Sequence, residues 1–282
     1  MPTLMQYLSP LYLFFFIINY LVFSLEYESY AVVIDAGSTG SRLFVLRFIF
    51  KDGIRNIIPS EGLKISPGLS SFSSNPQGVV DYITPVIIKS IPKVPVEHLN
   101  KTKLYIKATA GMRLILLAEE DLIWSHLIAG LRSNYNIPYI IDDENFGTID
   151  GYSEGYYAVL ASNFVAGRID GSLRRIEGKD MLGALDMGGS STQLIYMNKD
   201  VEHGHPVTKN DFWLHSWLNY GVEAMRERLL NHFISKSDLQ ILEFEAELIG
   251  DVSKYEKTII ENPCAFIGYK EVYFRYKNII YS

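Results

Sequence analysis

The sequence predicts an α/β fold with two lobes, and two observations lead to this prediction. First, short apolar runs typical of buried strands alternate along the chain with longer segments that have the apolar spacing of helices. Second, one local pattern occurs twice. An apolar run ends at an aspartate, passes through small and hydroxylated residues, and resumes as another apolar run, once at Asp35 and once at Asp186. The two aspartates lie about one domain length apart, which indicates two related halves.

The first lobe is expected to span residues 27–165. Its first two strands, 31–35 and 42–50, flank the first small-residue loop. Residues 51–78 are rich in Gly, Pro and Ser and therefore predict a loop. The elements expected next, in chain order, are a helix at 79–90, a strand at 103–111, a helix at 114–132, a strand at 137–142 and a helix at 147–165 that starts near Gly147.

The second lobe is expected to span residues 166–282, with the boundary placed just before a polar, glycine-bearing connection at 167–180. Trp213 and Trp217 lie four positions apart in a segment with helical spacing, which favours packing over a base-stacking platform. The elements expected here are strands at 182–186 and 192–197, which flank the second small-residue loop, and a helix at 213–234.

The composition permits a large core and excludes one class of partner. The chain has 282 residues, of which 48% are apolar, enough for one large domain or two of ordinary size. Its 26 basic and 32 acidic residues give a net charge of -6, without a long run of either sign. No nucleic-acid partner is expected, because phosphate contacts need clustered cations. A small anionic substrate requires local donors or a metal ion to offset the repulsion.

Residues 4–25, LMQYLSPLYLFFFIINYLVFSL, are almost entirely apolar and uncharged. This length predicts that segment 1–26 is a signal peptide or a signal anchor. Glu26 and Glu28 follow it, a weak asymmetry that favours the amino terminus inside and the rest in the lumen or outside. The alternative, a buried core helix, is disfavoured because the aromatic cluster has no polar face. The expected location is the secretory pathway, either membrane-anchored at the cell surface or in the Golgi or ER lumen, or secreted.

The loop after Asp35, in DAGSTGSR, has the chemistry of a phosphate site. Gly37 and Gly40 allow positive φ and let the backbone approach a ligand closely. Successive N–H groups in such a turn form an anion-binding concavity. Asp35 is suited to hold Mg²⁺ or Ca²⁺, often through water. Hydroxyl donors for phosphate oxygens come from Ser38, Thr39 and Ser41.

The loop after Asp186 repeats this chemistry with Gly188, Gly189, Ser190 and Ser191. Two such loops facing each other would grip a polyphosphate between two lobes. For either loop alone, an ordinary β-hairpin is an adequate explanation. Two loops that each begin with Asp at the end of an apolar strand favour a functional site.

Two other segments offer candidate residues, although each has a simple structural explanation. KATAGMR at 107–113 places Thr109 at a strand tip and Arg113 at the opening of a helix, which is also what a plain strand–helix turn would show. GYSEGYYAVLASNF at 151–164 places Glu154 near a helix start, where the helix dipole favours a carboxylate.

Five segments together resemble the nucleoside triphosphate diphosphohydrolases, the apyrase or GDA1/CD39 nucleoside phosphatase family of the actin and sugar-kinase superfamily. The resemblance spans residues 31 to about 270 and implies a two-lobed, ribonuclease H-like fold with a cleft between the lobes. Its second and third segments are specific to apyrases. The five segments are DAGSTGSR at 35–42, KATAGMR at 107–113, GYSEGYYAVLASNF at 151–164, LDMGGSSTQ at 185–193 and SWLNYGVEAMRERL at 216–229.

The resemblance implies hydrolysis of nucleoside tri- or diphosphates to lower phosphates and inorganic phosphate, without a phosphoenzyme. Asp35 and Asp186 would anchor a hydrated Ca²⁺ or Mg²⁺, and Glu154 would be the base for the attacking water. Asn163 matches an asparagine of the family. The other catalytic residues implied are Ser191, Gln193 and Thr109. The phosphate-binding residues implied are Gly37, Ser38, Thr39, Gly40, Arg42, Gly188, Gly189 and Ser190.

The chain departs from the family pattern at three positions within the five segments and in its length. Val159 replaces a usual Trp and Phe164 a usual Tyr, both at expected packing positions, and Ser190 replaces a common Ala. Family members continue well past residue 282, and much of their nucleobase contact comes from that part. NPCAFIGYK at 262–270 resembles a segment whose cysteine pairs with a later one, so Cys264 suggests that the second lobe is truncated.

Two alternatives to a nucleotide hydrolase remain open. One is a truncated, non-catalytic paralogue that binds nucleotide or a protein partner. The other is a hydrolase of inorganic polyphosphate, which would share the phosphate loops but would not need the second and third segments. Asn100, in NKT, is a possible glycosylation acceptor in either case.

Overall fold

The computed structural model describes residues 27–51, 54–134, 136–198, 202–236, 274–276 and 279–281. The chain divides into two compact units, Met1–Val222 and Glu223–Ser282. The apolar leader at 4–25 and Cys264 lie outside the described residues. Within the described ranges, no helix combines the length and the apolar character that crossing a membrane requires.

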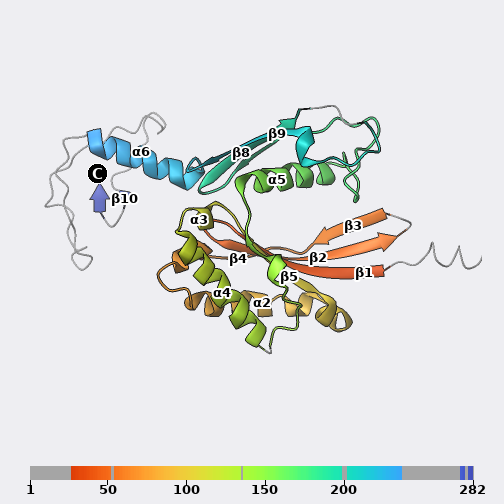
Figure 1. The fold of residues 1–282 in the computed structure, drawn as a ribbon, viewed down its shortest axis with the longest axis horizontal. Helices are drawn as coiled ribbons and strands as arrows, with labels where there is room; N and C mark the ends of the chain where they lie inside the picture. The colour runs from red at the N-terminus through yellow and green to blue at the C-terminus, as the bar shows by residue number, and fades with distance from the viewer. Residues whose placement is uncertain are drawn as a thin grey trace, which may run out of the picture. The chain divides into compact units, whose positions relative to one another are not determined.

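The first layer of the first unit is a sheet of six described strands (Figure 1). At its centre, β1 (Tyr27–Ala36) is antiparallel to β2 (Ser41–Lys51) and parallel to β5 (Lys103–Ala108). The outer strands are β3 (Ile54–Pro59) and β4 (Leu63–Ile65), which pair with β2, and β6 (Phe146–Thr148), which pairs with β5.

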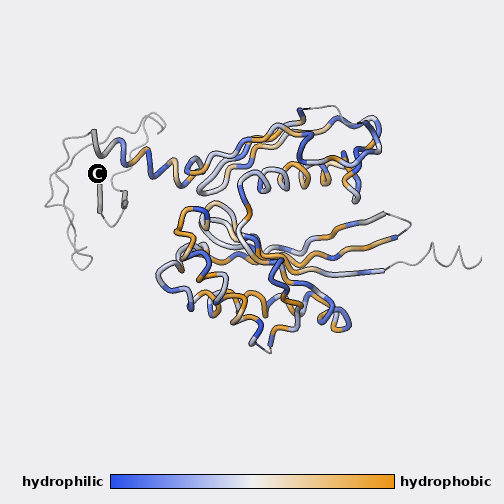
Figure 2. Tube along the Cα trace, viewed as in Figure 1, coloured by the Kyte–Doolittle hydropathy of each residue, from blue (hydrophilic) through white to orange (hydrophobic). Residues whose placement is uncertain are grey.

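The alternation of residues along β1 gives this sheet one face that is buried in the core and one face that carries Asp35. Val32, Ile34 and Ala36 are buried on one face, whereas Asp35 between them points to the other. The helices α2 (Gly78–Ile88) and α4 (Leu117–Ser133) both lie on the buried side (Figure 1). Figure 2 shows the apolar stretches of these strands and helices, which supply the main core. The core therefore holds β1 rigidly while its other face remains available for chemistry.

The second layer of the first unit consists of three strands and one helix. Strands β7 (Ala184–Met187), β8 (Ser191–Met197) and β9 (Phe212–Leu218) form an antiparallel sheet in that order. The helix α5 (Gly151–Val165) packs along it and forms a second buried cluster with it. Val159 is completely buried in this cluster and Phe164 packs against it, which confirms that both are packing positions.

The second unit contributes few described elements. The helix α6 (Val222–Lys236) begins at the last residue of the first unit. Two short strands, β10 (Phe274–Tyr276) and β11 (Ile279–Tyr281), pair with each other. The predicted lobe boundary near residue 166 falls inside the first unit, between α5 and β7, and stays a prediction.

The predicted helices at 79–90 and 114–132 and the predicted strands at 182–186 and 192–197 are confirmed with shifted ends. The predicted loop at 51–78 is wrong in part, because it contains β3, β4 and the short helix η1 (Leu69–Phe72). Its Gly, Pro and Ser residues lie between these elements, while the apolar stretch of β3 pairs with β2.

The strand predicted at 137–142 is also wrong, since only an isolated bridge joins Ile140 to Lys103. The strand that extends the sheet is β6, which includes Gly147 with φ 135°, outside the helical region. The helix α5 consequently begins at Gly151, after the cap Asp150, and not near Gly147 as predicted.

The helix predicted at 213–234 is wrong over its first part, which forms β9. Phe212 is buried against α5, and the next residue, Trp213, faces the other way. The rings of Trp213, His215 and Trp217 follow one another along that outer face, with centroids 6.2 Å and 4.3 Å apart. A spacing of four fits both a helix and a strand, so the two tryptophans could not distinguish them.

Candidate active site

The first small-residue loop is the turn of the β1–β2 hairpin, as predicted, and the strands pair up to Ala36 and Ser41. Neither Gly37 nor Gly40 uses the positive φ that glycine allows. What Gly40 needs is space, because a Cβ atom there would lie 2.5 Å from the carbonyl oxygen of Ile65. The turn is therefore packed closely onto the end of β4.

The second small-residue loop is the turn of the β7–β8 hairpin, and it is held by the segment that follows β9. The Gly188 N–H donates to the Ser191 carbonyl at 3.0 Å, which closes the turn. From the other side, the Asn219 N–H donates to the Ser190 carbonyl at 2.7 Å and the Val222 N–H to the Gly188 carbonyl at 2.9 Å. Sequence reasoning did not assign this bracing role to residues 219–222.

The two loops meet at Ser38. A Cβ atom at Gly189 would lie 2.4 Å from Ser38 Oγ and 2.9 Å from Thr39 Cγ2. On another side, a Cβ atom at Gly111, in α3 (Ala110–Arg113), would lie 2.7 Å from Ser38 Cα. The structure thus brings together the tips of both predicted loops and the second apyrase-like segment within one compact unit.

Replacing Gly111 with Ala is expected to destabilise the fold by about 1–2 kcal/mol, because the added methyl group overpacks a backbone atom that cannot rotate away. Gly188→Ala is the matched control, since its nearest neighbour would be the Ser191 carbonyl oxygen at an ordinary 3.6 Å. Urea unfolding of both variants measures the difference. Equal stability of the two variants would contradict the close packing of α3 on the Ser38 turn.

The two aspartates occupy equivalent places in their hairpins. Asp35 is the register partner of Arg42, and Asp186 that of Gln193. The Asp35 side chain remains accessible to solvent. Partial burial of its carboxyl group raises the pKa of that group, the nearby Arg42 guanidinium opposes the rise, and the Asp186 carboxylate raises the pKa further. The two carboxylates are therefore close enough to repel each other.

These two carboxylates suit one kind of metal ion. Over the described part of the chain, no group of three or more His, Cys, Asp or Glu side chains could hold a metal. Mg²⁺, and Ca²⁺ in open sites, can be bound by one or two carboxylates with water and substrate oxygens completing the shell. The mutual repulsion of Asp35 and Asp186 would be relieved by such a cation. The residues present thus fit a hydrated divalent cation.

Glu154 lies in the first turn of α5, at a position fixed by the cap of that helix. The Asp150 carboxylate accepts a hydrogen bond from the Ser153 N–H at 2.6 Å, which holds the helix start in place. The Glu154 side chain is only 12% exposed. Burial raises its pKa, and the nearby Arg113 guanidinium opposes that rise; the carboxylates of Asp186 and Asp35 raise the pKa further.

The Glu154 carboxylate is part of a hydrogen-bonded network that crosses from α5 to β8. The Gln193 amide nitrogen lies 3.0 Å from Glu154 Oε2, 2.9 Å from Ser191 Oγ and 3.0 Å from Ser216 Oγ. A flipped amide would place its oxygen against the carboxylate, so Glu154 fixes its orientation. Gln193 is completely buried, and its Oε1 atom has no partner among the described residues. Ser191 and Gln193, predicted from one segment, thus lie together with Glu154, predicted from another.

Arg113 is the functional candidate that sequence reasoning did not select. Its Nη2 atom donates to Glu154 Oε2 at 2.8 Å and to Ser191 Oγ at 3.2 Å, and its Nη1 atom donates to the Ile149 carbonyl at 2.8 Å. The only local signal was its place at the end of the KATAGMR segment. Ser216 was missed as well, because it was predicted to lie on a helix.

The remaining predicted residues fall into different surroundings. Thr109 follows β5 directly and its N–H donates to the Ala36 carbonyl at 3.2 Å, beside the first loop. Asn163 is completely buried, and its amide bonds the backbone of Val159 and Leu182, so it joins α5 to the start of the second sheet. Ser41 is completely buried too, and its Oγ atom has no partner among the described residues, so the phosphate-binding hydroxyl expected there stays a prediction.

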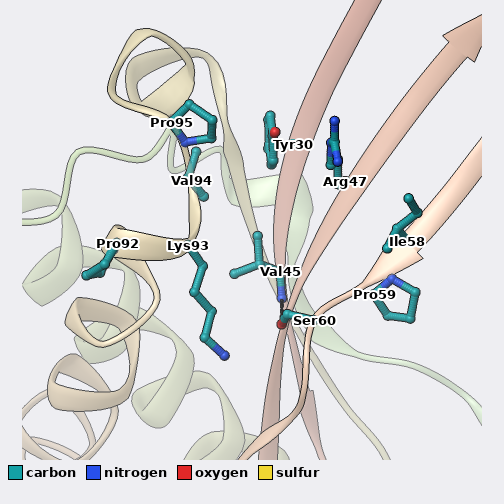
Figure 3. A pocket seen from close by; sticks show the side chains of 10 residues that line it. All are labelled: Tyr30, Val45, Arg47, Ile58, Pro59, Ser60, Pro92, Lys93, Val94 and Pro95. Carbon is teal, nitrogen blue, oxygen red and sulfur yellow. Dashed lines mark hydrogen bonds between the residues drawn. The ribbon is translucent and has the colours of Figure 1, made fainter.

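Two hollows on the first sheet are separate from these loops. One, of about 410 Å³, is lined by Tyr30, Arg47 and several prolines (Figure 3). Its Arg47 is paired with Glu28. The other, of about 490 Å³, is lined partly by Lys103 and Lys107, of which Lys103 pairs with Asp142 at 2.9 Å. Neither is lined by the paired loops or by Glu154, so neither is the site that the sequence predicts.

Comparison with known proteins gives one family. The profile of the GDA1/CD39 (nucleoside phosphatase) family matches residues 22–280. The nucleoside-triphosphatase ntp-1 of Caenorhabditis elegans is 40% identical over 174 residues, which are 59% of this chain and 31% of that protein. The guanosine-diphosphatase of Schizosaccharomyces pombe is 30% identical over 260 residues, 86% of this chain and 43% of that protein. The chain thus spans less than half the length of these two curated relatives.

A solved structure of nucleoside triphosphate hydrolases from Neospora caninum has a similar fold. It matches with a TM-score of 0.56 and 16% sequence identity, over 79% of this chain and 50% of that one. At this identity the likeness concerns the fold alone, and it confirms the predicted mixed α/β architecture.

Proposed function

The chain belongs to the GDA1/CD39 (nucleoside phosphatase) family, and from this premise we propose that it hydrolyses nucleoside tri- or diphosphates to lower phosphates and inorganic phosphate. The observation that carries the proposal is the meeting of two aspartate-tipped hairpins at Ser38, beside the hydrogen-bonded Glu154. Hydrolysis of a phosphoanhydride needs positioning, charge neutralisation and a base for water, and these residue types offer all three.

The proposed phosphate site lies between the two hairpin turns. Donors come from the backbone N–H groups and hydroxyls of the turns, and Arg42, which is exposed beside Asp35, adds positive charge. A Cβ atom at Gly189 would crowd the Ser38 and Thr39 side chains, so glycine at this position lets the two turns approach closely and leaves the backbone N–H groups of the second turn available to a ligand. These features support the proposed phosphate-binding residues Gly37, Ser38, Thr39, Gly40, Arg42, Gly188, Gly189 and Ser190.

Glu154 is the proposed base, since its buried carboxylate has a raised pKa that favours proton acceptance. Ser191 and Gln193 are proposed to orient the attacking water. The buried Gln193 Oε1 atom, without a partner in the described ranges, supports this role because it can accept a hydrogen bond from water. Thr109 is also proposed to lie close to that water, and the support is its place at the end of β5, where its N–H donates to the Ala36 carbonyl beside the first turn. Water then attacks the terminal phosphorus directly and gives its proton to Glu154, while the bond between that phosphorus and the bridging oxygen breaks and the lower nucleoside phosphate leaves, so no phosphoenzyme forms.

Asp35 and Asp186 are proposed to hold Ca²⁺ or Mg²⁺ through water. When bound, a divalent cation neutralises phosphate charge and helps to align the leaving group. The acidic balance of the chain makes this neutralisation necessary, because a polyphosphate would otherwise meet a net charge of -6.

We also propose a location in the secretory pathway, either anchored through residues 4–25 or released from them. The support is the uncharged apolar leader. Asn100 lies exposed at the end of the short helix Val96–Lys101, where a glycan would be accommodated.

Phosphate release from a panel of nucleoside di- and triphosphates, with Ca²⁺, with Mg²⁺ and with chelator, tests the proposed activity. Cation-dependent release from nucleotides is expected, with little release from inorganic polyphosphate. Calorimetric nucleotide binding without turnover would instead identify a non-catalytic nucleotide-binding protein. Turnover of polyphosphate in preference to nucleotides would overturn the proposed substrate class.

A further inference from the structure

Arg113 lies between the two layers of the first unit, and the proposed function assigns it no role. It lies at the end of α3, directly after the strand–helix turn of the first sheet. Its guanidinium reaches Glu154 on α5 and Ser191 at the start of β8, both of which belong to the second layer. The side chain is 16% exposed and makes its ion pair with a carboxylate that is 12% exposed, so water screens the pair weakly.

The direction of these hydrogen bonds restricts what the acceptors can do. Ser191 Oγ accepts from Arg113 and also from the Gln193 amide nitrogen, because neither nitrogen has a lone pair to offer; the two amide protons of Gln193 are shared among Ser191, Glu154 and Ser216. A hydroxyl oxygen has two lone pairs and one proton. With both lone pairs occupied, the remaining function of the Ser191 hydroxyl is to donate its proton.

The carboxylate of Glu154 is restricted in a complementary way. The hydrogen bonds that it accepts from Arg113 and Gln193 both end on Oε2. Its other oxygen, Oε1, is left as the acceptor for a proton. One donor from Ser191 and one acceptor from Glu154 is the arrangement that a water molecule needs to be oriented and then deprotonated.

We propose that Arg113 is a positioning residue for hydrolysis, which fixes the Ser191 hydroxyl as a donor and Glu154 Oε1 as an acceptor around the attacking water. The inference rests on the proposed function. It assigns no phosphate contact to Arg113, whose three hydrogen bonds all go to protein groups. The other terminal nitrogen of the guanidinium, Nη1, donates to the Ile149 carbonyl, so the planar group is held in one orientation.

Arg113→Met is expected to lower kcat about 10- to 100-fold with little change in KM, because it removes charged donors that do not bind substrate. The charged groups that act on Glu154 are Arg113 from α3, Asp35 from β1 and Asp186 from β7. Loss of the guanidinium removes the positive charge that lowers the pKa of Glu154, so the acidic limb of the kcat/KM profile should move to higher pH. A merely structural role would lower the yield of folded enzyme without moving this limb.

Arg113→Lys keeps the charge but loses the planar fork, so it should restore the acidic limb more fully than it restores kcat. Arg132→Met is the matched control, since Arg132 also pairs with a carboxylate, Asp143 at 2.7 Å, and bonds a carbonyl, that of Ile141. It lies on α4, away from the paired loops, and should keep the wild-type rate and pH profile. Circular dichroism of each variant establishes that it is folded.

The outcomes separate this inference from the proposed function. If the wild type releases phosphate and Glu154→Gln does not, but folded Arg113→Met keeps the wild-type kcat and acidic limb, the inference is overturned and the proposed function stands. A rise in KM alone would overturn it too, by making Arg113 a substrate ligand. If Arg113→Met does not fold, wild-type kinetics in Arg113→Lys would overturn the planar-fork argument. A wild type that hydrolyses no nucleotide overturns the proposed function, and the inference with it.

Discussion

Glu154→Gln is expected to lower kcat by about 1,000-fold, because it removes the proposed base, and general-base catalysis typically contributes 10²–10⁴-fold. The substitution is nearly isosteric, and the amide can still accept hydrogen bonds from Arg113 through its oxygen. Nucleotide affinity should therefore change little. Steady-state phosphate release gives kcat, and calorimetry on the same preparation gives the binding constant.

The pH dependence of wild-type activity tests the same assignment, because the direction in which activity should change with pH follows from the role of Glu154 as a base. A base works when it is deprotonated, so kcat/KM should fall as the pH drops through the pKa of Glu154. Burial raises that pKa above the ordinary glutamate value, with Arg113 opposing, so the acidic limb should lie at higher pH than for an exposed glutamate. Glu97→Gln is the matched control, because Glu97 is exposed in the short helix Val96–Lys101. Unchanged activity in Glu154→Gln would refute the assigned base.

The parts of the fold that the sequence predicted well are local ones. The apolar run, aspartate and small residues around Asp35 and Asp186 lie within single hairpins, and both hairpins form as expected. The helices α2 and α4 repeat their apolar residues with helical spacing and were also found. Errors arose where two periods fit equally, as for Trp213 and Trp217, or where strand pairing overrode local composition, as in β3.

The candidate site could be predicted residue by residue but not as a network. Arg113 is 41 positions from Glu154 and 78 from Ser191, and no periodicity connects such distant residues. Its role follows only from the tertiary arrangement, in which α3 ends beside α5 and β8. The hydrogen bond from Asn219 to Ser190 could not be predicted either, because Ser190 lies in the β7–β8 turn and Asn219 lies in the separate segment that follows β9. The sequence alone can therefore reveal carboxylates at the ends of strands, but it does not reveal hydrogen-bond donors that reach the site from distant parts of the chain.

Asp35→Asn and Asp186→Asn are each expected to lower activity about 100-fold at limiting cation, since groups that hold a metal through water typically contribute 10–100-fold. Saturating Ca²⁺ or Mg²⁺ should restore part of the loss, because the defect lies in cation affinity. The double variant should lose less than the product of the two single effects, as both carboxylates are proposed to hold one ion. Cation titrations of phosphate release measure all three variants.

The electrostatics of the pair make this prediction specific. Asp186 raises the pKa of Asp35, so the two carboxylates repel each other and a shared cation would turn that repulsion into attraction. A bound cation should therefore raise the thermal midpoint of the wild type, and less so that of either single variant. Asp121→Asn, on the exposed face of α4, is the matched control and should respond to cation as the wild type does. If both single variants keep the wild-type cation dependence, the two hairpins do not hold a common ion and the proposed metal site is wrong.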